Sequence, residues 1–282
     1  MLVTRRYTFV NLRCLTPILI KNPKYSTSFG KFENGNLVPP PLYVRVPCGK
    51  CYACRRNKQN QWVCRILLEL LVSRGSLMFV LTYDDEHLPP DYKVNKKHVQ
   101  DFLKRLRHEF DFRYFIASEY GSKSGRPHYH CIFFLKEIPK LSHLRSVTTK
   151  WQNGSVHFMS TTLASINYSL KYCTKQALFD DKMFALMSRR PGLGSTTTHN
   201  DILKCYDKNT NTINVFGNRF NLPRYLRIKF DIPLDSEVLD AFYYGQDVVS
   251  DFLDANGNID YRRYNSAITV REYKLKQIKD KI

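Results

Sequence analysis

Two histidines stand one residue apart at the head of an apolar run, in the stretch Arg126–Phe134 (RPHYHCIFF). Side chains alternate between the two faces of a strand, so His128 and His130 point to one side and Tyr129 to the other. Two imidazoles on one face can share a metal ion, although a metal site needs further ligands. The alternative for such a pair is a solvated strand end. The rest of the chain must therefore show whether it supplies more ligands.

A carboxylate is expected opposite these histidines. The loop GSKSGR separates two predicted strands, and a symmetric hairpin around it places Glu119 directly across from His128. A register shift of one residue would turn Glu119 to the other face, where it would be an ordinary surface carboxylate. One carboxylate and two imidazoles with open positions suit Mg²⁺ or Mn²⁺, divalent ions that can also hold a phosphate oxygen.

A second group of reactive side chains lies in INYSLKYCTKQA. Apolar residues from Ile166 to Ala177 recur at the spacing of a buried helical stripe. A lysine next to a phenol can lower its pKa or neutralise phosphate charge, so the opposite face suits phosphoryl chemistry. The alternative is amphipathic packing with lysines at solvated edges. That face carries Tyr168, Lys171, Tyr172 and Lys175.

The segment CGKCYAC brings Cys48, Cys51 and Cys54 within seven residues but lacks a fourth ligand nearby. Cys14 is the first choice for the fourth ligand and Cys64 the second. A structural Zn²⁺ would fasten the N-terminal arm to the helix that follows, whereas the alternative is free thiols in a reduced cytosol. The zinc would also bring four cations to where they can meet phosphate: Lys50, Arg55, Arg56 and Lys58.

Hydrophobic periodicity gives the elements that must position these residues. The stretch Leu77–Tyr83 (LMFVLTY) is expected to be a central strand because it has too few polar residues to face water. Hairpins mixed with helices predict an α+β domain with an antiparallel sheet, one face covered by helices and one free for a site. The expected helices span 57–74, 96–110, 143–152, 163–178 and 235–253, and the expected strands span 77–83, 113–120, 127–135 and 155–159.

Composition points to a polyanionic partner. The 282 residues include 44 Lys and Arg against 25 Asp and Glu, a net charge of +19. Residues 1–60 hold eleven of the basic residues and a single acid, Glu33, whereas residues 201–282 are nearly neutral. The longest early apolar run, Cys14–Ile20, is too short to span a bilayer and no signal-peptide pattern is present. We therefore expect a cytoplasmic protein that binds nucleic acid and no membrane.

Three segments in this order and spacing resemble the motifs of HUH endonucleases, the rolling-circle replication initiators: Leu81–Tyr83 (LTY), RPHYHCIFF and YSLKY. With SEYG and the N-terminal CGKC, the chain more closely resembles initiators of small single-stranded DNA phages of the microvirus type, the gokushovirus branch in particular. The resemblance covers roughly residues 45–176. It implies a basic arm with a Cys-rich element over 1–60, an HUH nuclease domain over 61–190, and a C-terminal extension of unknown role over 191–282.

The resemblance implies roles for the site residues. His128 and His130, with Glu119 as third ligand, would bind the catalytic divalent ion, and Tyr168 and Tyr172 would be the nucleophiles. Attack by a phenolate would leave a 5′-phosphotyrosine and a free 3′-hydroxyl that primes synthesis. The second tyrosine would serve the cut that releases a closed circle, and Lys171 would stabilise phosphate or phenolate. Lys175 is expected to contact DNA.

Two other classes of function remain open at this stage. A relaxase or an HUH transposase shares the chemistry but serves plasmid transfer or element mobility. A non-enzymatic, zinc-containing DNA-binding protein would use the basic arm alone. The chain has no GxxxxGK[ST] loop, so it encodes no helicase of that class. An initiator would therefore act on single-stranded and supercoiled phage DNA together with a host helicase and a host DNA polymerase.

Overall fold

A computed structural model describes residues 8–9, 14, 16–22, 31–33, 36–38, 42–121, 124–175, 183–232 and 266. The predicted helix 235–253 lies outside these residues. The chain divides into two compact units, one formed by Met1–Val10 and Asn57–Pro233 and the other by Asn11–Arg56 and Leu234–Ile282. The functional division predicted at residues 60 and 190 remains a prediction. No helix in the described part of the chain combines the length and apolar content that crossing a bilayer requires.

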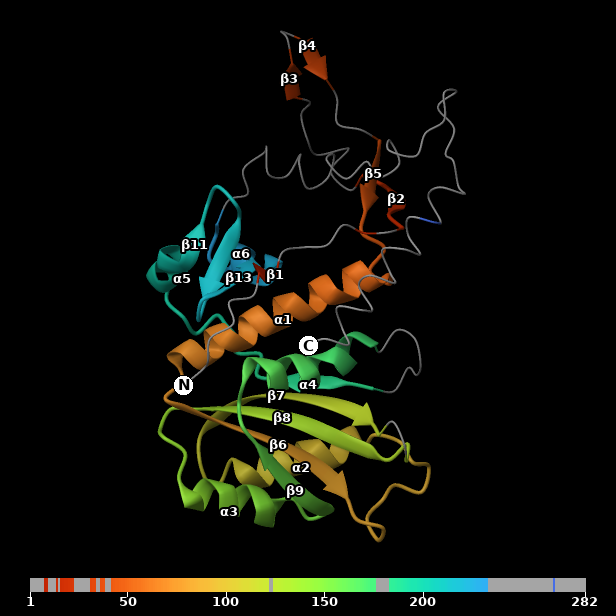
Figure 1. Ribbon diagram of the computed structural model, residues 1–282, viewed down its shortest axis with the longest axis vertical. Helices are drawn as coiled ribbons and strands as arrows, with labels where there is room; N and C mark the ends of the chain where they lie inside the picture. Colours follow the sequence, from red (N-terminus) through yellow and green to blue (C-terminus); the bar gives the residue numbers. More distant parts are fainter. Residues whose placement is uncertain are drawn as a thin grey trace. The chain divides into compact units, whose positions relative to one another are not determined.

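The larger unit is built on a five-stranded antiparallel sheet in the order β10-β7-β8-β6-β9 (Figure 1). β8 lies at its centre because PHYHCIFFL is apolar at almost every position, as a strand covered on both faces must be. The predicted α+β class with an antiparallel sheet is thus confirmed. The strands are β6 (Gly75–Tyr83), β7 (Phe112–Tyr120), β8 (Pro127–Leu135), β9 (Gly154–Met159) and β10 (Ala185–Met187).

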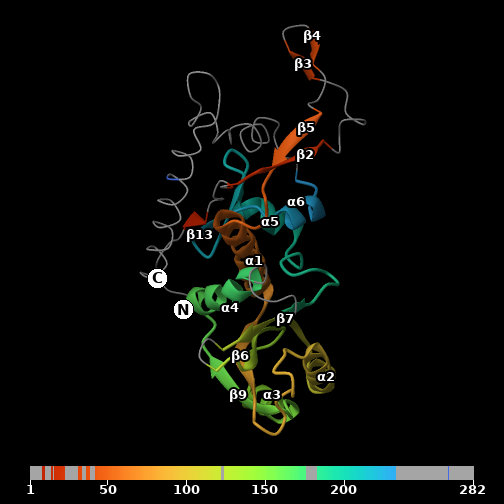
Figure 2. The same cartoon turned by 90° about the vertical axis from the view of Figure 1, so that its right-hand side faces the viewer.

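Helices cover both faces of this sheet, so the expectation of one free face was wrong (Figures 1 and 2). α1 (Tyr52–Val72) and α4 (Leu163–Lys175) share a buried cluster with residues such as Met78 and Ile132. α2 (Lys96–Leu106) and α3 (Leu141–Lys150) pack on the other face against residues such as Phe79 and Phe133. Strands of this apolar content need cover on both sides, since an exposed face would leave their side chains in water.

α2 forms where its sequence predicts. Asn95 caps its first turn by accepting hydrogen bonds from the amides of Lys97 and His98. Its apolar stripe, Val99, Phe102, Leu103 and Leu106, is buried.

α1 begins at Tyr52, five residues before the predicted start. The charged run RRNKQ hides the helical period in its first turns, although Ala53 and Cys54 are buried there. Within the larger unit, Arg65 of α1 lies between the rings of Trp62 and Tyr225, with its guanidinium 4.3 Å and 4.2 Å from their centroids. Its Nε also donates to Leu193 O at 3.0 Å, so this arginine connects α1 to the chain beyond residue 190.

A second sheet in the same unit has the order β1-β13-β12-β11, with β1 parallel to β13. Its apolar residues, including Ile213, Val215 and Phe220, join the buried cluster of α1 and the first sheet. The described residues after Pro191 are therefore a folded part of this unit rather than a polar tail. The elements are β1 (Thr8–Phe9), α5 (His199–Cys205), β11 (Tyr206–Asp207), β12 (Thr212–Val215), β13 (Asn218–Asn221) and α6 (Arg224–Lys229).

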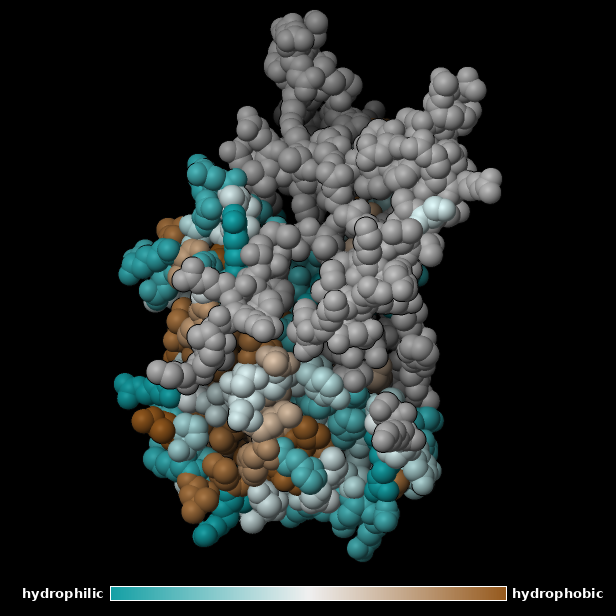
Figure 3. Space-filling model, viewed as in Figure 1, coloured by the Kyte–Doolittle hydropathy of each residue, from teal (hydrophilic) through white to brown (hydrophobic). Residues whose placement is uncertain are grey.

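The smaller unit contains two short antiparallel pairs, β2 (Ile18–Lys21) with β5 (Tyr43–Val46) and β3 (Lys31–Glu33) with β4 (Asn36–Val38). In the larger unit, β9 forms one edge of the five-stranded sheet. Hydrophobic side chains gather on the lower part of the face in Figure 3, and Phe158 and Met159 of β9 are each 38 % exposed. The edge strand is thus only partly covered.

Candidate metal and nucleophile site

The β7–β8 hairpin sets the register of the site. Glu119 pairs directly with His128, and Ala117 with His130, so the predicted register is confirmed. The loop closes through bonds from Gly121 N to Arg126 O and from Gly125 N to Gly121 O, both 2.9 Å. Gly125 takes a positive φ of 65°, a backbone conformation that glycine adopts without steric cost. The length of this loop thus places the carboxylate opposite the histidine.

Three potential ligands converge on this face of the sheet. Glu119 Oε2 lies 2.6 Å from His130 Nε2 and 3.3 Å from His128 Nε2. Glu119 and His130 are each 3 % exposed, whereas His128 is half-buried. Burial alone would raise the pKa of Glu119, but hydrogen bonding to His128 and His130 outweighs it and lowers the pKa to about 2. The site therefore holds an ionised carboxylate beside two imidazoles.

These residues fit a divalent cation. One ligand atom from each of the three residues lies within 4.8 Å of the others. His128 Nδ1 is 3.3 Å from Arg126 O, so this nitrogen can donate its proton to the carbonyl oxygen. In that tautomer His128 Nε2 keeps its lone pair for a metal, and a histidine ligand held by a carbonyl oxygen in this way is common in metal sites. A cation would also balance the buried charge of Glu119.

Tyr168 of α4 reaches this cluster. Its ring lies edge-on to His130, with 5.5 Å between ring centroids and 73° between ring planes. Ile166 and Leu170, on either side of it in sequence, are fully buried and anchor α4 on the sheet, as the predicted stripe requires. Tyr168 is 48 % exposed, so a phenol next to the histidines remains accessible from solvent.

The rest of the predicted tyrosine motif is only partly described. Tyr172, Lys171 and Lys175 belong to α4, beyond Tyr168 in the chain, but their side chains lie outside the described residues. Their predicted roles therefore stay predictions.

The smaller unit gathers the four cysteines of the first-choice set. The sulfur atoms of Cys14, Cys48, Cys51 and Cys54 all lie within 4.8 Å of one another, and none of them forms a disulfide bond. Cys14 Sγ and Cys51 Sγ are 3.9 Å apart, close to the edge of about 3.8 Å expected for a zinc–thiolate tetrahedron. Cys64, the second choice, is instead fully buried in the core of the larger unit.

Backbone amides point at the sulfur atoms of this cysteine cluster. Cys51 N donates to Cys48 Sγ and Cys48 N donates to Cys14 Sγ, both at 3.3 Å, and Thr16 Oγ1 also donates to Cys48 Sγ at 3.3 Å. Burial raises the pKa of Cys48, but these donors outweigh it and lower the pKa to about 6. Burial raises the pKa of Cys14 and Cys54. A cation is what would keep all four ionised, so the donor set fits zinc.

The predicted DNA-contacting cations near the cysteines differ in exposure. Lys50 and Lys58 are exposed, whereas Arg55 and Arg56 are half-buried. Cys131, predicted to be a small core residue, is fully buried.

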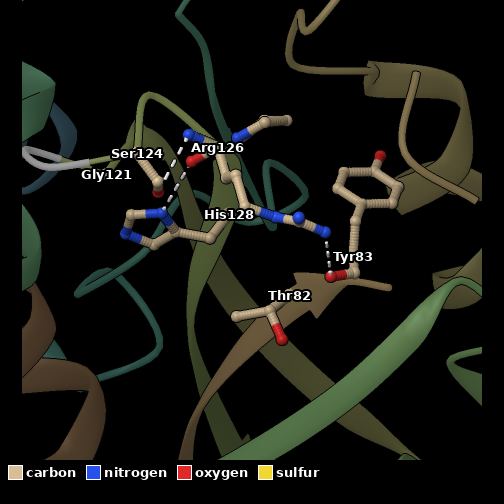
Figure 4. A pocket seen from close by; sticks show the side chains of 7 residues that line it. Thr82, Tyr83, Gly121, Ser124, Arg126 and His128 are labelled. Carbon is tan, nitrogen blue, oxygen red and sulfur yellow. Dashed lines mark hydrogen bonds between the residues drawn. The ribbon is translucent and has the colours of Figure 1, made fainter. Parts of the chain in front are cut away.

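Several polar residues beside the histidines were missed from the sequence. Thr82 of β6 pairs with His128 on one side and Ser155 of β9 on the other, and its hydroxyl lies 2.8 Å from Ser155 Oγ. His157 is on the same face, because it pairs with Val80, the partner of His130. Figure 4 shows Arg126 and Thr82 next to the ring of His128. Only the pairing of β6 with two strands distant in sequence reveals this row.

Comparisons with known proteins agree with the motifs. Residues 76–177 match the family model of the phage replication-associated protein ORF2. The chain is 28 % identical over 270 residues to replication-associated protein ORF2 of Spiroplasma virus 4, which covers 82 % of this chain and 83 % of the relative. It is 28 % identical over 152 residues to replication-associated protein VP4 of Bdellovibrio phage phiMH2K, covering 46 % of this chain and 48 % of that relative.

A third relative is replication-associated protein ORF4 of Chlamydia phage 1, 26 % identical over 229 residues, or 71 % of this chain and 57 % of the relative. No solved structure matches the chain. The matches confirm the resemblance to replication proteins of microvirus-like phages and support a role in phage replication.

Proposed function

From a chain whose central region matches the replication-associated proteins of small phages, we propose an initiator endonuclease that nicks DNA at an origin and rejoins the displaced strand. The observation that carries this proposal is the placement of Tyr168 against His130, within a cluster of two imidazoles and a carboxylate. A phenol and potential metal ligands on one exposed site are the two parts that phosphoryl transfer to tyrosine requires.

The nicking step follows from the phenol. The oxygen of Tyr168, having lost its proton, attacks the scissile phosphorus, and the bond from phosphorus to the 3′-oxygen breaks. The 3′-oxygen takes up a proton and becomes the hydroxyl that primes synthesis, while the 5′-phosphate stays on the tyrosine. One ester replaces another, so rejoining needs no nucleotide.

Rejoining is the reverse reaction. The 3′-hydroxyl of the displaced strand attacks the phosphotyrosine, the phosphorus–phenol bond breaks, and the tyrosine recovers its proton. A second tyrosine at position 172, about one helical turn further along α4, would cut the regenerated junction while Tyr168 still holds the first strand. Lys171, between them in sequence, would stabilise the phenolate or the phosphate.

Glu119, His128 and His130 would hold a catalytic Mg²⁺ or Mn²⁺. Such an ion polarises a phosphate and offsets the negative charge that develops during attack. The carboxylate of Glu119 contributes the charge that attracts the cation, and the carbonyl of Arg126 fixes the ring of His128. The four-cysteine cluster would hold a structural Zn²⁺.

The substrate would be single-stranded or supercoiled phage DNA. The net charge of +19 supports binding to its phosphates, with Lys50, Arg55, Arg56, Lys58 and Lys175 as the proposed contacts. A host helicase would separate the strands and a host polymerase would extend the 3′-hydroxyl.

The test is covalent capture. The full chain is incubated with Mg²⁺ or Mn²⁺ and single-stranded fragments tiled across the phage genome that encodes it, and denaturing gels reveal protein–DNA adducts. Mass spectrometry should find the adduct on the peptide that contains Tyr168 and Tyr172. Tyr168→Phe combined with Tyr172→Phe should abolish capture. Tyr92→Phe is the matched control, because Tyr92 is 57 % exposed and lies before α2.

The outcome also decides between classes of function. DNA binding without any adduct on these fragments or on supercoiled circles would favour a zinc-containing DNA-binding protein, which the cysteine cluster alone could support. Adducts that survive the double substitution would place the nucleophile elsewhere.

A further inference from the structure

A cavity of about 320 Å³ opens next to His128, and the proposed chemistry does not use it (Figure 4). It lies where β6 ends and where the β7–β8 loop leads into β8. Its size is that of a small-ligand site rather than a gap between side chains. The described residues that line it are Thr82, Tyr83, Gly121, Ser124, Arg126, Pro127 and His128.

Arg126 is the only formally charged side chain among these lining residues, which include no carboxylate. Its Nη2 donates to Tyr83 O at 3.1 Å, and its backbone follows the loop that sets the register of the site. The carbonyl bond holds the guanidinium beside the cavity whatever its other partner is. A planar guanidinium is well suited to phosphate, to which it can donate two parallel hydrogen bonds.

The other partner of Arg126 is easily exchanged. Nη1 lies 2.6 Å from Asp85 Oδ1, but the side chain of Asp85 is 92 % exposed and that of Arg126 is 36 % exposed. An ion pair so open to water contributes little to stability, because solvent screens it and hydrates both charges well. A phosphate entering the cavity could therefore replace Asp85 at small cost.

The cavity also adjoins the polar row on the sheet. The hydroxyl of Thr82, one of its lining residues, bonds to Ser155 on β9, and His128 forms its boundary with the metal ligands. A DNA strand that presents one phosphate to His128 and Tyr168 would thus pass its neighbouring phosphate over Arg126.

We propose that this cavity binds the backbone phosphate next to the scissile one, and that Arg126 is the positioning residue that holds it by exchanging Asp85 for phosphate. This inference rests on the proposed nicking function, because it assumes that the scissile phosphate sits at the histidines. It assigns to Arg126 the placement of the strand and not a part in bond breaking.

The experiment measures equilibrium binding of the full chain to the single-stranded fragment that binds best, without added divalent ions so that binding is read apart from cleavage. Each phosphate in turn is replaced by an uncharged methylphosphonate, and fluorescence anisotropy gives the Kd. Arg126→Gln should weaken binding about tenfold, as expected for a hydrogen bond to a charged group. One methylphosphonate should weaken the wild type by a similar factor and weaken Arg126→Gln no further.

Two variants separate phosphate contact from a structural role. Asp85→Asn should bind as tightly as the wild type or more tightly, since it removes the competitor of phosphate. Lys97→Gln is the control, because Lys97 forms a comparably exposed ion pair with Asp101 on α2, on the other side of the sheet. Should Arg126→Gln fail to fold, Arg126→Lys replaces it and should show a smaller loss at the same phosphate.

Two results would overturn the inference: losses that add at every phosphate, or an Asp85→Asn variant as weak as Arg126→Gln. The proposed nicking function fails separately. Coupling of Arg126 to one phosphate without covalent capture would leave a phosphate site in a protein that does not nick. Capture without coupling would remove only the role of Arg126.

Discussion

Glu119 and His128 are direct cross-strand partners, and the same carboxylate oxygen that faces His128 Nε2 at 3.3 Å lies 2.6 Å from His130 Nε2. Three side chains from two adjacent strands thus meet at one point without help from any distant element. A hairpin alone is sufficient to build this cluster, which explains how a short stretch of sequence can specify it.

Divalent cations should stabilise the fold through Glu119. A ligand at about 100 times its Kd adds about 2.7 kcal/mol to the free energy of unfolding, so we expect Mn²⁺ to raise the Tm by roughly 5–10 °C. Glu119→Gln removes the charged ligand and should abolish most of this shift in a thermal melt. Glu137→Gln, at a surface carboxylate near His143 and Lys140, should retain it. An equal shift in both variants would place the cation elsewhere.

Chelation should separate cleavage from binding. Removing divalent ions with EDTA is expected to stop covalent capture, because Glu119 and the histidines act through a cation. Most DNA affinity should persist, since it comes from a net charge of +19, and it should fall steeply as salt increases. Capture assays and anisotropy titrations at several salt concentrations check both parts. Capture that continues in excess chelator would contradict the metal role.

The cysteine cluster should carry one zinc ion per chain. Elemental analysis of the purified protein measures this directly. Cys48→Ser removes a ligand whose sulfur accepts hydrogen bonds from Cys51 N and Thr16, and should lower the zinc content to well below one. Cys205→Ser is the control, because Cys205 is a partly exposed free cysteine of α5 outside the cluster. Full zinc in both variants would refute the assignment.

A buried carboxylate connects α1 to the chain after Pro191. Glu69 is 1 % exposed and pairs with Arg113 Nε at 2.5 Å, Gly194 N at 2.8 Å and Thr196 Oγ1 at 3.0 Å. Glu69→Gln leaves Arg113 without its charge partner and should lower the free energy of unfolding by about 3 kcal/mol. Chemical denaturation measures this loss.

Glu109→Gln is the matched control for Glu69. Glu109 pairs with Lys150 at the surface, where water screens the interaction, so its loss should leave the denaturation midpoint almost unchanged. A similar midpoint for both variants would show that the buried contacts of Glu69 do not hold these segments together.

Local signals explain what the sequence could predict. The loop GSKSGR fixed the pairing of Glu119 with His128, and the apolar stripe through Ile166 and Leu170 placed Tyr168 on the open side of α4. Both inferences depend on neighbours within one hairpin or one helix. The gathering of Cys14 with the later cysteines was also expected, on ligand number alone.

Nonlocal pairing accounts for what was missed. Thr82, Ser155 and His157 became neighbours of the site only when β6 paired with both β8 and β9, which no local period reveals. The second sheet was overlooked because its strands are only two to four residues long. The alternation of buried and exposed residues around Phe216 and Gly217 was the available signal, a short hairpin within a polar stretch.

The parallel pairing of Thr8 and Phe9 with Arg219 and Phe220 has a consequence for biosynthesis. The first strand to leave the ribosome has no partner until β13 has been translated. The second sheet can therefore close only late in synthesis, after the hairpin that carries the histidines has emerged. The nascent chain would assemble its reactive centre first and secure its amino-terminal end last.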